Sequence, residues 1–250
     1  MEWRESGGVR WLEADLGRAR AAFASRLGGV SEPPFDALNL GILTDDDPAA
    51  VATNRGRLVA ALGLEADRVP VGLQVHGADL LFHTAPQRPS PFAEPGAGEL
   101  AEADGHVVSA PGLAPLVLSA DCLPVALAGP GGAAILHCGW RGLAAGIVAA
   151  GAAAIEASEA AIGPGIGPCC YEVGEEVLDA FPDLGEGIAE GRMLDLAAVA
   201  KRLLERAGVG RIQSAGLCTR CEPELFFSHR RDAGKTGRQG SLVWLEAAQA

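Results

Sequence analysis

Three residues of types that bind transition metals lie where apolar stretches of this 250-residue chain end: His76 in GLQVHG, Cys122 in LSADCLP and His137 in AILHCGWRG. Each follows an apolar run and precedes a turn that contains glycine or proline, so the three can converge at one edge of a sheet. Two imidazoles and one thiolate form a zinc ligand set that leaves a fourth position open, as in catalytic sites. By spacing alone, buried residues without a metal are the more common interpretation of such a trio.

Asp121 and Cys138 adjoin two of these residues in the sequence and carry groups suited to the same site. Asp121 carries a carboxylate that either orients a ligand and moves protons or binds backbone amides within its own turn. Cys138 follows His137 directly, and alternation along a strand turns its side chain to the opposite face. We therefore predict Asp121 at the site and Cys138 outside the ligand set.

The other four cysteines form no obvious motif. Cys218 and Cys221 are a single CxxC pair, and the proline at position 223 disfavours a thioredoxin-like helix start. A zinc ribbon needs a second pair, and the adjacent Cys169 and Cys170 are badly spaced for one. The CxxC pair is interpreted as structural, or as oxidisable without a function.

Arginines in glycine-rich segments indicate a small anion. Ser25 and Arg26 precede a Leu-Gly-Gly sequence, and Arg141 lies in GWRG. Guanidinium groups, hydroxyls and free backbone amides are the donors that bind phosphate or ribose. Each arginine alone is more often a surface residue, but together they predict an anion beside the metal.

Charge and hydropathy exclude several classes of partner. The formal net charge is −12, which disfavours nucleic acid and anionic lipid because both are bound by Lys and Arg. No stretch approaches the ~18 apolar residues of a membrane-spanning helix, and the N-terminus does not resemble a signal peptide. We therefore expect a cytoplasmic protein, in which six cysteines do not form a disulfide framework.

Capping signals predict three helices. Asp47 is an N-cap before Pro48, and that helix ends near residue 62, before Gly63. A second helix follows Arg141 through an Ala-rich stretch, and a third ends before Gly208. The predicted ranges are 48–62, about 140–157, and within 195–207.

Strands are predicted in seven runs bounded by turn residues. Helices and strands do not alternate strictly, which favours an α+β or mixed-sheet α/β fold over a doubly wound parallel one. The proline-rich segment 86–98 is expected to be a loop within a single domain that spans residues 1–250. The predicted strands are 71–76, 105–109, 116–119, 125–128, 133–137, 211–215 and 242–245.

Seven segments together resemble one widespread bacterial family, from about residue 23 to residue 244. In order they are SRLGGVSEPPFDALNLG, LQVHG, ADG, LSADCLPV, ILHCGWRG, IGPGIGPCCYEVG and FFSHRRDAGKTGRQ. The family was long called polyphenol oxidase or laccase-like and was later reassigned to purine nucleoside metabolism. Two departures are small: alanine is usual where Cys138 stands, and a shorter glycine-threonine link is common in place of DAGKTGR.

The resemblance implies a mixed-sheet sandwich, layered α/β/β/α, with one zinc ion bound by His76, Cys122 and His137. Copper is the alternative metal in vitro. It also implies purine nucleoside phosphorylase activity on adenosine, inosine and related nucleosides, with methylthioadenosine phosphorolysis and adenosine deamination besides. The expected partners are nucleosides and phosphate, and a monomer is expected. The residues predicted to act in catalysis are His76, Cys122, His137 and Asp121, and those predicted to bind substrate or phosphate are Ser25, Arg26, Asn39, Gln74 and Arg141.

Three other interpretations stay open. A copper-dependent phenol oxidase is disfavoured because a multicopper centre needs far more histidines than the five of this chain. In a cysteine hydrolase, Cys122 would be the nucleophile and His76 or His137 the base, which suits relatives linked to editing of peptidoglycan precursors. A non-catalytic metal-binding module is disfavoured because three ligands leave a coordination position open.

Overall fold

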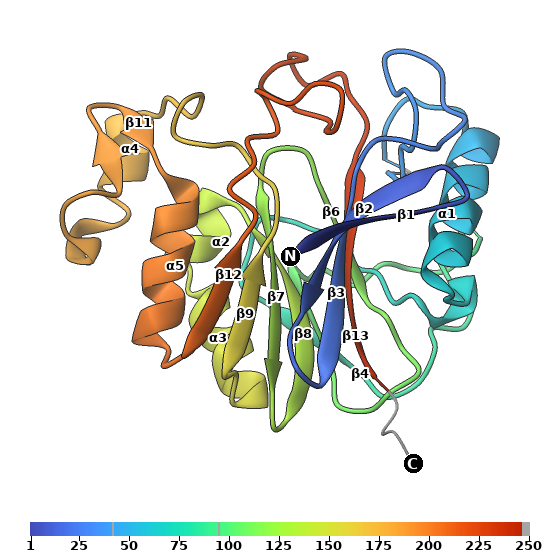
Figure 1. Cartoon of the computed structure of the whole chain (residues 1–250), viewed down its shortest axis with the longest axis horizontal. Helices are drawn as coiled ribbons and strands as arrows, with labels where there is room; N and C mark the ends of the chain where they lie inside the picture. Colours follow the sequence, from blue (N-terminus) through green and yellow to red (C-terminus); the bar gives the residue numbers. More distant parts are fainter. Residues whose placement is uncertain (42, 95, 247–250) are drawn as a thin grey trace.

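The computed structural model describes residues 1–41, 43–94 and 96–246, and its strands form two large sheets that face each other (Figure 1). The five-stranded sheet is antiparallel throughout. Its order is β1 (Glu2–Ser6), β2 (Val9–Asp15), β3 (Ala19–Ala24), β13 (Gln239–Leu245) and β6 (Leu116–Ser119).

The six-stranded sheet is mixed. Its order is β12 (Arg211–Ser214), β9 (Glu159–Ile162), β7 (Leu123–Gly129), β8 (Gly132–Cys138), β5 (Gly105–Val108) and β4 (Leu80–His83). The pairs β12–β9 and β4–β5 are parallel, whereas β9–β7, β7–β8 and β8–β5 are antiparallel.

Helices cover the outer faces of both sheets. The longest is α1 (Pro48–Leu62), which packs on the five-stranded sheet, while α2 (Trp140–Ala144), α3 (Ile147–Ile155) and α5 (Leu196–Arg206) pack on the six-stranded sheet (Figure 1). The short α4 (Glu175–Leu178) and the hairpin of β10 (Ala189–Glu190) and β11 (Met193–Leu194) lie beyond α5. Two single 3₁₀ turns complete the set, at Ala66–Arg68 and Pro182–Leu184.

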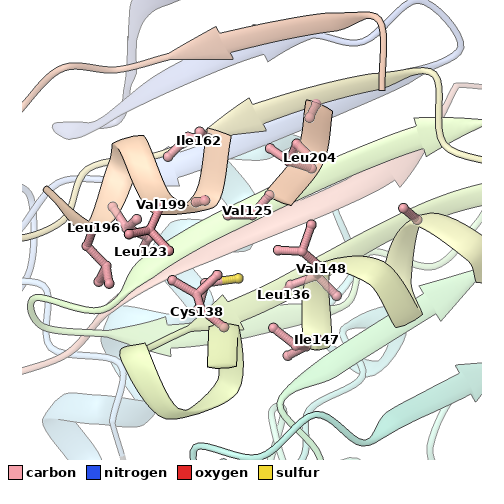
Figure 2. Close-up of a cluster of buried hydrophobic side chains, with 14 of the residues drawn as sticks. Leu123, Val125, Leu136, Cys138, Ile147, Val148, Ile162, Leu196, Val199 and Leu204 are labelled. Carbon is pink, nitrogen blue, oxygen red and sulfur yellow. The ribbon is translucent and has the colours of Figure 1, made fainter. Parts of the chain in front are cut away.

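Three buried hydrophobic clusters separate these layers. Val117 and Ile135 belong to the cluster between the two sheets, and Leu58 of α1 belongs to the cluster outside the five-stranded sheet. Val125 and Val199 belong to the third cluster, between the six-stranded sheet and its helices (Figure 2). Full burial of one such side chain stabilises the fold by roughly 1.5–3 kcal/mol. The order of layers is therefore α/β/β/α, and the predicted mixed α/β class is confirmed.

Two of the predicted helices are confirmed, and the third is divided. Asp47 caps α1 by accepting from the amide of Ala49, and Gly63 ends it at φ 67°. Asp195 caps α5 in the same manner. The expected single helix over 140–157 is wrong because Gly146, at φ 91°, interrupts it between α2 and α3.

Six of the seven predicted strands are confirmed to within a few residues. The seventh, 71–76, is wrong: the segment is irregular and forms only one bridge, from Leu73 to Glu102. Strands β1 to β4 and β9 to β11 were not predicted; β1 is largely exposed and charged, and β3 is rich in alanine. The described residues of the predicted loop 86–98 contain no helix or strand. In the described part of the chain, no helix has both the length and the apolar character to span a bilayer.

Candidate active site

The three candidate ligands His76, Cys122 and His137 converge at one point. Their nitrogen and sulfur atoms all lie within 4.8 Å of one another, and the two imidazole centroids are 4.9 Å apart. His137 is near the end of β8, and Cys122 lies where the chain passes from β6 in one sheet to β7 in the other. His76 comes from the loop before β4. The predicted convergence is therefore seen in the structure.

The fully buried side chain of Asp104, just before β5, holds two of these residues in place. Its Oδ1 accepts hydrogen bonds from Nδ1 of His137 at 2.7 Å and from the amide of His76 at 3.0 Å. Its Oδ2 accepts from the amides of Val75 at 3.0 Å and Gly77 at 2.7 Å. These bonds fix a loop in which His76 adopts φ 61°, and they leave Nε2 of His137 for a metal.

The electrostatics of the cluster favour a thiolate. Burial raises the pKa of the Cys122 thiol, but His137 and His76 lower it more, to about 6. Burial lowers the pKa of His137, but the Cys122 thiolate and the Asp104 carboxylate raise it more, to about 9. Near neutral pH the metal-free pair is thus thiolate and imidazolium, and metal binding releases the proton from His137.

A glycine at the end of β8 allows this close packing. A Cβ atom at Gly139 would lie 3.0 Å from Sγ of Cys122 and 3.0 Å from Cδ2 of His76. One turn on, a Cβ at Gly142 would lie 2.8 Å from the carbonyl oxygen of Gly77. The GWRG turn therefore carries glycines because two other segments approach its backbone.

A cavity of about 480 Å³ opens beside the three candidate ligands. This volume is in the range of small-molecule sites. Leucines form much of one wall, and arginines from three segments reach the same space. The leucines include Leu73, Leu100, Leu116 and Leu118, and the arginines at the surface of the cavity include Arg141, Arg230 and Arg238.

Two of the predicted substrate-binding residues line this cavity. The guanidinium of Arg141 stacks over the ring of Trp140, 4.6 Å from its centroid. Gln74 bonds the backbone of Leu118 twice, donating from Nε2 and accepting at Oε1, each at 2.7 Å. Gln74 therefore joins the His76 loop to β6, and its amide is engaged by protein rather than free for a ligand.

The structure does not bring Ser25 and Arg26 to the cavity wall. The Ser25 hydroxyl is buried and donates to the carbonyl oxygen of Arg10 at 2.8 Å. Arg26 forms an ion pair with Asp36 at 3.2 Å and stacks over the ring of Phe227. Both side chains hold the loop after β3, because their polar groups bond within it and to neighbouring segments.

Asn39 is also outside the cavity wall, but it supports a residue of that wall. Its Nδ2 donates to Thr44 at 2.9 Å and to Asp46 at 2.8 Å. Its Oδ1 accepts from the amides of Gly41 and Arg238. Asn39 thus positions Arg238, which lines the cavity.

Asp121 lines the cavity, and its carboxylate bonds two distant segments rather than the amides of its own turn. It has φ 92°, and its carboxylate accepts from the hydroxyl of Thr219 at 2.6 Å and from the amide of Arg230 at 2.7 Å. None of the side-chain hydrogen bonds described for it reaches a candidate metal ligand. Cys138, as predicted, points away and is fully buried in the core (Figure 2).

Four residues of the site were missed by sequence analysis. Asp104 had a signal, because ADG directly precedes a predicted strand. Arg230 and Arg238 lie in the arginine-rich segment after residue 227 and reach the cavity only through long-range packing. Tyr171 had no signal; it lines the cavity, and burial raises the pKa of its hydroxyl to about 12.

Comparison with known proteins places this arrangement in a family. Residues 20–246 match the family described as multi-copper polyphenol oxidoreductase laccase. The chain belongs to this family. The predicted resemblance to the laccase-like family is therefore confirmed.

Relatives of this laccase-family chain match most of its length. It is 41% identical over 238 residues to a purine nucleoside phosphorylase of Xylella fastidiosa, and the aligned region covers 87% of this chain and 88% of the relative. It is 40% identical over 239 residues to purine nucleoside phosphorylase YfiH of Escherichia coli, with 90% and 93% covered. The crystal structure of hypothetical protein YfiH from Bacillus licheniformis superposes with a TM-score of 0.88 at 33% identity, with 98% and 99% covered.

Proposed function

We propose that this chain is a metal-dependent purine nucleoside phosphorylase. It would convert a purine nucleoside and phosphate into the free base and ribose 1-phosphate, with adenosine and inosine among its substrates. The names of relatives about 40% identical over nearly the whole chain support this assignment. The observation that carries it is one cavity that joins a His/Cys/His set, an apolar wall and several arginines.

Zinc fits the donor set best. Two imidazoles and one thiolate within 4.8 Å of one another match a catalytic zinc site with one open position, and Asp104 supplies the carboxylate that commonly orients a zinc-bound histidine. When bound, zinc supplies Lewis acidity and lowers the pKa of a bound water. His76, Cys122 and His137 would hold it, and copper is the alternative metal in vitro.

The side chains of the cavity suit the parts of the substrate. The leucine wall would pack on the apolar purine ring, and Arg141 with Arg230 would hold the phosphate dianion near the anomeric carbon. A phosphate oxygen forms a bond to that carbon as the glycosidic C–N bond breaks, and the purine leaves with the electron pair and takes up one proton. The arginines favour this step because they position the phosphate and neutralise its charge.

The decisive experiment is incubation of the purified chain with adenosine, with and without phosphate, followed by chromatography. Phosphorolysis predicts adenine and ribose 1-phosphate only when phosphate is present. Deamination, the proposed second activity, predicts inosine in both conditions, and methylthioadenosine is tested in the same way. The His76→Ala variant is the control, since it is expected to lose the metal of the active site and all turnover. Absence of any product from the metal-loaded chain would overturn the proposal.

A cysteine hydrolase is the second candidate, because Cys122, His137 and Asp104 follow one another as nucleophile, base and orienting carboxylate. Its substrate would be an amide, such as a peptidoglycan precursor. Metal analysis separates the two functions: activity that is lost with a chelator and restored by zinc supports the phosphorylase, whereas an active metal-free chain supports the hydrolase. A cytoplasmic monomer stays a prediction.

A further inference from the structure

Four cysteines outside the active site meet at a second point of the molecule. The sulfur atoms of Cys169, Cys170, Cys218 and Cys221 all lie within 4.8 Å of one another. Cys221 is the centre of the group, with its sulfur 3.4 Å from those of Cys169 and Cys170. The expectation that the vicinal pair is badly placed to complete a metal site with the CxxC pair is therefore wrong.

Parallel strand pairing brings the two segments together. Strands β9 and β12 are parallel neighbours, so the loops that follow them leave the sheet at the same edge (Figure 1). The pairing continues beyond the strands: the amide of Gly165 donates to Leu217, and the amide of Thr219 donates to Gly165. The segments are about fifty residues apart in the sequence, and the sheet aligns them.

Each loop then makes one tight turn that gathers its sulfurs. The amides of Cys170 and Tyr171 donate to the carbonyl oxygen of Gly167, and the amides of Cys221 and Glu222 donate to that of Cys218. In such turns adjacent or i, i+3 side chains reach the same side, which extended backbone would prevent.

Gly167 shapes the contact between the loops. A Cβ atom there would lie 3.2 Å from Cβ of Cys218, which is tight, and 3.5 Å from Sγ of Cys169, which is ordinary contact, so a larger residue would crowd Cys218. The amide of Gly167 donates to Sγ of Cys218 at 3.2 Å. Backbone N–H donors around a sulfur are the kind of outer partner that orients a thiolate ligand.

The separations match a metal bound by four sulfurs. With a Zn–S bond of about 2.3 Å, the sulfurs of a tetrahedral site lie about 3.8 Å apart. The observed separations, from 3.4 Å to at most 4.8 Å, bracket that value. We propose that Cys169, Cys170, Cys218 and Cys221 bind a structural divalent metal of the zinc type, in addition to the metal of the active site.

This second site supports the wall of the cavity. Thr219, fully buried between the two cysteines of the CxxC pair, donates to Asp121 at 2.6 Å, next to Cys122. Tyr171, adjacent to Cys170, lines the cavity and lies under the guanidinium of Arg230. The metal would therefore position residues 171 and 219 without touching substrate.

Metal stoichiometry tests the proposal. The full chain, purified under reducing conditions and saturated with zinc, is expected to hold about two zinc ions by elemental analysis. The double variants Cys218→Ser/Cys221→Ser and Cys169→Ser/Cys170→Ser should each hold one. His76→Ala should also hold one, at the other site. Cys138→Ala is the matched control, because it removes a buried cysteine that belongs to neither group, and it should keep both.

Two further measurements apply even where a variant fails to fold. In the wild-type chain with cobalt in place of zinc, thiolate charge-transfer absorption should exceed that expected for the single cysteine of the active site. The four thiols should also resist alkylation until a chelator is added, as mapped by mass spectrometry. One zinc per wild-type chain with all four thiols freely alkylated would overturn the proposal, and so would a disulfide among them or iron in place of zinc.

Discussion

The Asp104 carboxylate holds His137 and the His76 loop in position through hydrogen bonds. It bonds the His137 ring and three successive backbone amides around His76, so one side chain sets both a ligand orientation and a loop conformation. The fully buried carboxylate accepts four hydrogen bonds and is therefore satisfied. If asparagine replaced it, the NH₂ group of the new side chain would face some of these donors.

Asp104→Asn is therefore expected to weaken zinc binding by about 10–100-fold, since an amide cannot accept from all four donors. Competition with a chelating dye measures the affinity. Asp79→Asn is the matched control, because Asp79 is an exposed aspartate at the end of the His76 loop, directly before β4. Equal affinities for the wild-type chain and the Asp104 variant would refute the orienting role.

Arg141 is predicted to bind phosphate rather than the nucleoside. Loss of one charge-assisted hydrogen bond costs roughly 1.5–3 kcal/mol, so Arg141→Ala should raise the KM for phosphate about tenfold or more. The KM for inosine should change much less. Arg4→Ala, on the exposed strand β1, is the control. Steady-state kinetics with each substrate varied in turn gives both values, and equal effects on both would contradict the assignment.

At this scale, residue type alone identified His76, Cys122 and His137 as candidate ligands, because each ends an apolar run before a turn. It could not identify which arginines reach the cavity. Arg26 is engaged by Asp36 and Phe227, whereas Arg238 reaches the cavity from near the C-terminus. These differences arise from packing between distant segments, which no local pattern encodes.

The element that matters most for the candidate site is the turn from β8 into α2. His137 lies one residue before the end of the strand, and a Cβ atom at Gly139, which begins the turn, would lie 3.0 Å from side-chain atoms of Cys122 and His76. The backbone of this turn therefore lies directly against Cys122 and His76, and its glycine allows the two side chains to approach each other.

Gly139→Ala is expected to displace Cys122 or His76, and so to lower zinc affinity by at least about tenfold, because a Cβ contact at 3.0 Å is too close to both. Gly56→Ala in α1 is the matched control: nothing lies within 4 Å of its Cβ position, and alanine favours a helix interior by about 1 kcal/mol. Zinc titration of both variants, with thermal unfolding, checks the prediction. Unchanged zinc affinity in the Gly139 variant would show that the turn accommodates a Cβ atom without displacing the ligands, and would contradict the prediction.

Elements with local signals were predicted well, and those fixed by pairing were not. Asp47, Pro48 and Gly63 mark the two ends of α1 directly, so its predicted bounds are correct. Strand β9 and the two cysteine loops depend on parallel pairing with β12, a long-range contact. The segment 71–76 has the apolar composition of a strand, but two of its amides, those of Val75 and His76, bond the Asp104 side chain instead of a neighbouring strand.

Across the whole molecule, one buried histidine pair links stability to pH. His106 is fully buried in β5, and its Nδ1 shares a hydrogen bond of 2.9 Å with Nε2 of His83. Burial lowers the pKa of His106 to about 3, with a further contribution from His83, whose own pKa is lowered by burial. Below pH 6.5 the unfolded chain takes up a proton that the folded chain does not, so this contribution to stability is lost as the pH falls.

The expected loss from His106 is about 2 kcal/mol in the free energy of unfolding between pH 7 and pH 5. His106→Gln should flatten the pH dependence by about that amount, because glutamine does not titrate. His229→Gln, at an exposed histidine, is the matched control. Urea unfolding at a series of pH values measures the slopes, and parallel curves for the wild-type chain and His106→Gln would refute the linkage.

Strand order also sets when the candidate site can form during protein synthesis. Strand β6, which leads directly to Cys122, joins its sheet through β13, which is Gln239–Leu245. While a nascent chain still lacks those residues, β6 has no hydrogen-bonded neighbour among the described strands of that sheet, although β7 can already pair with β8 and bring Cys122 near His137. We therefore expect full metal affinity only once β13 has been made: a ribosome-bound chain stalled before residue 239 would have all three ligands, but the strand that leads to Cys122 would lack its partner in the sheet.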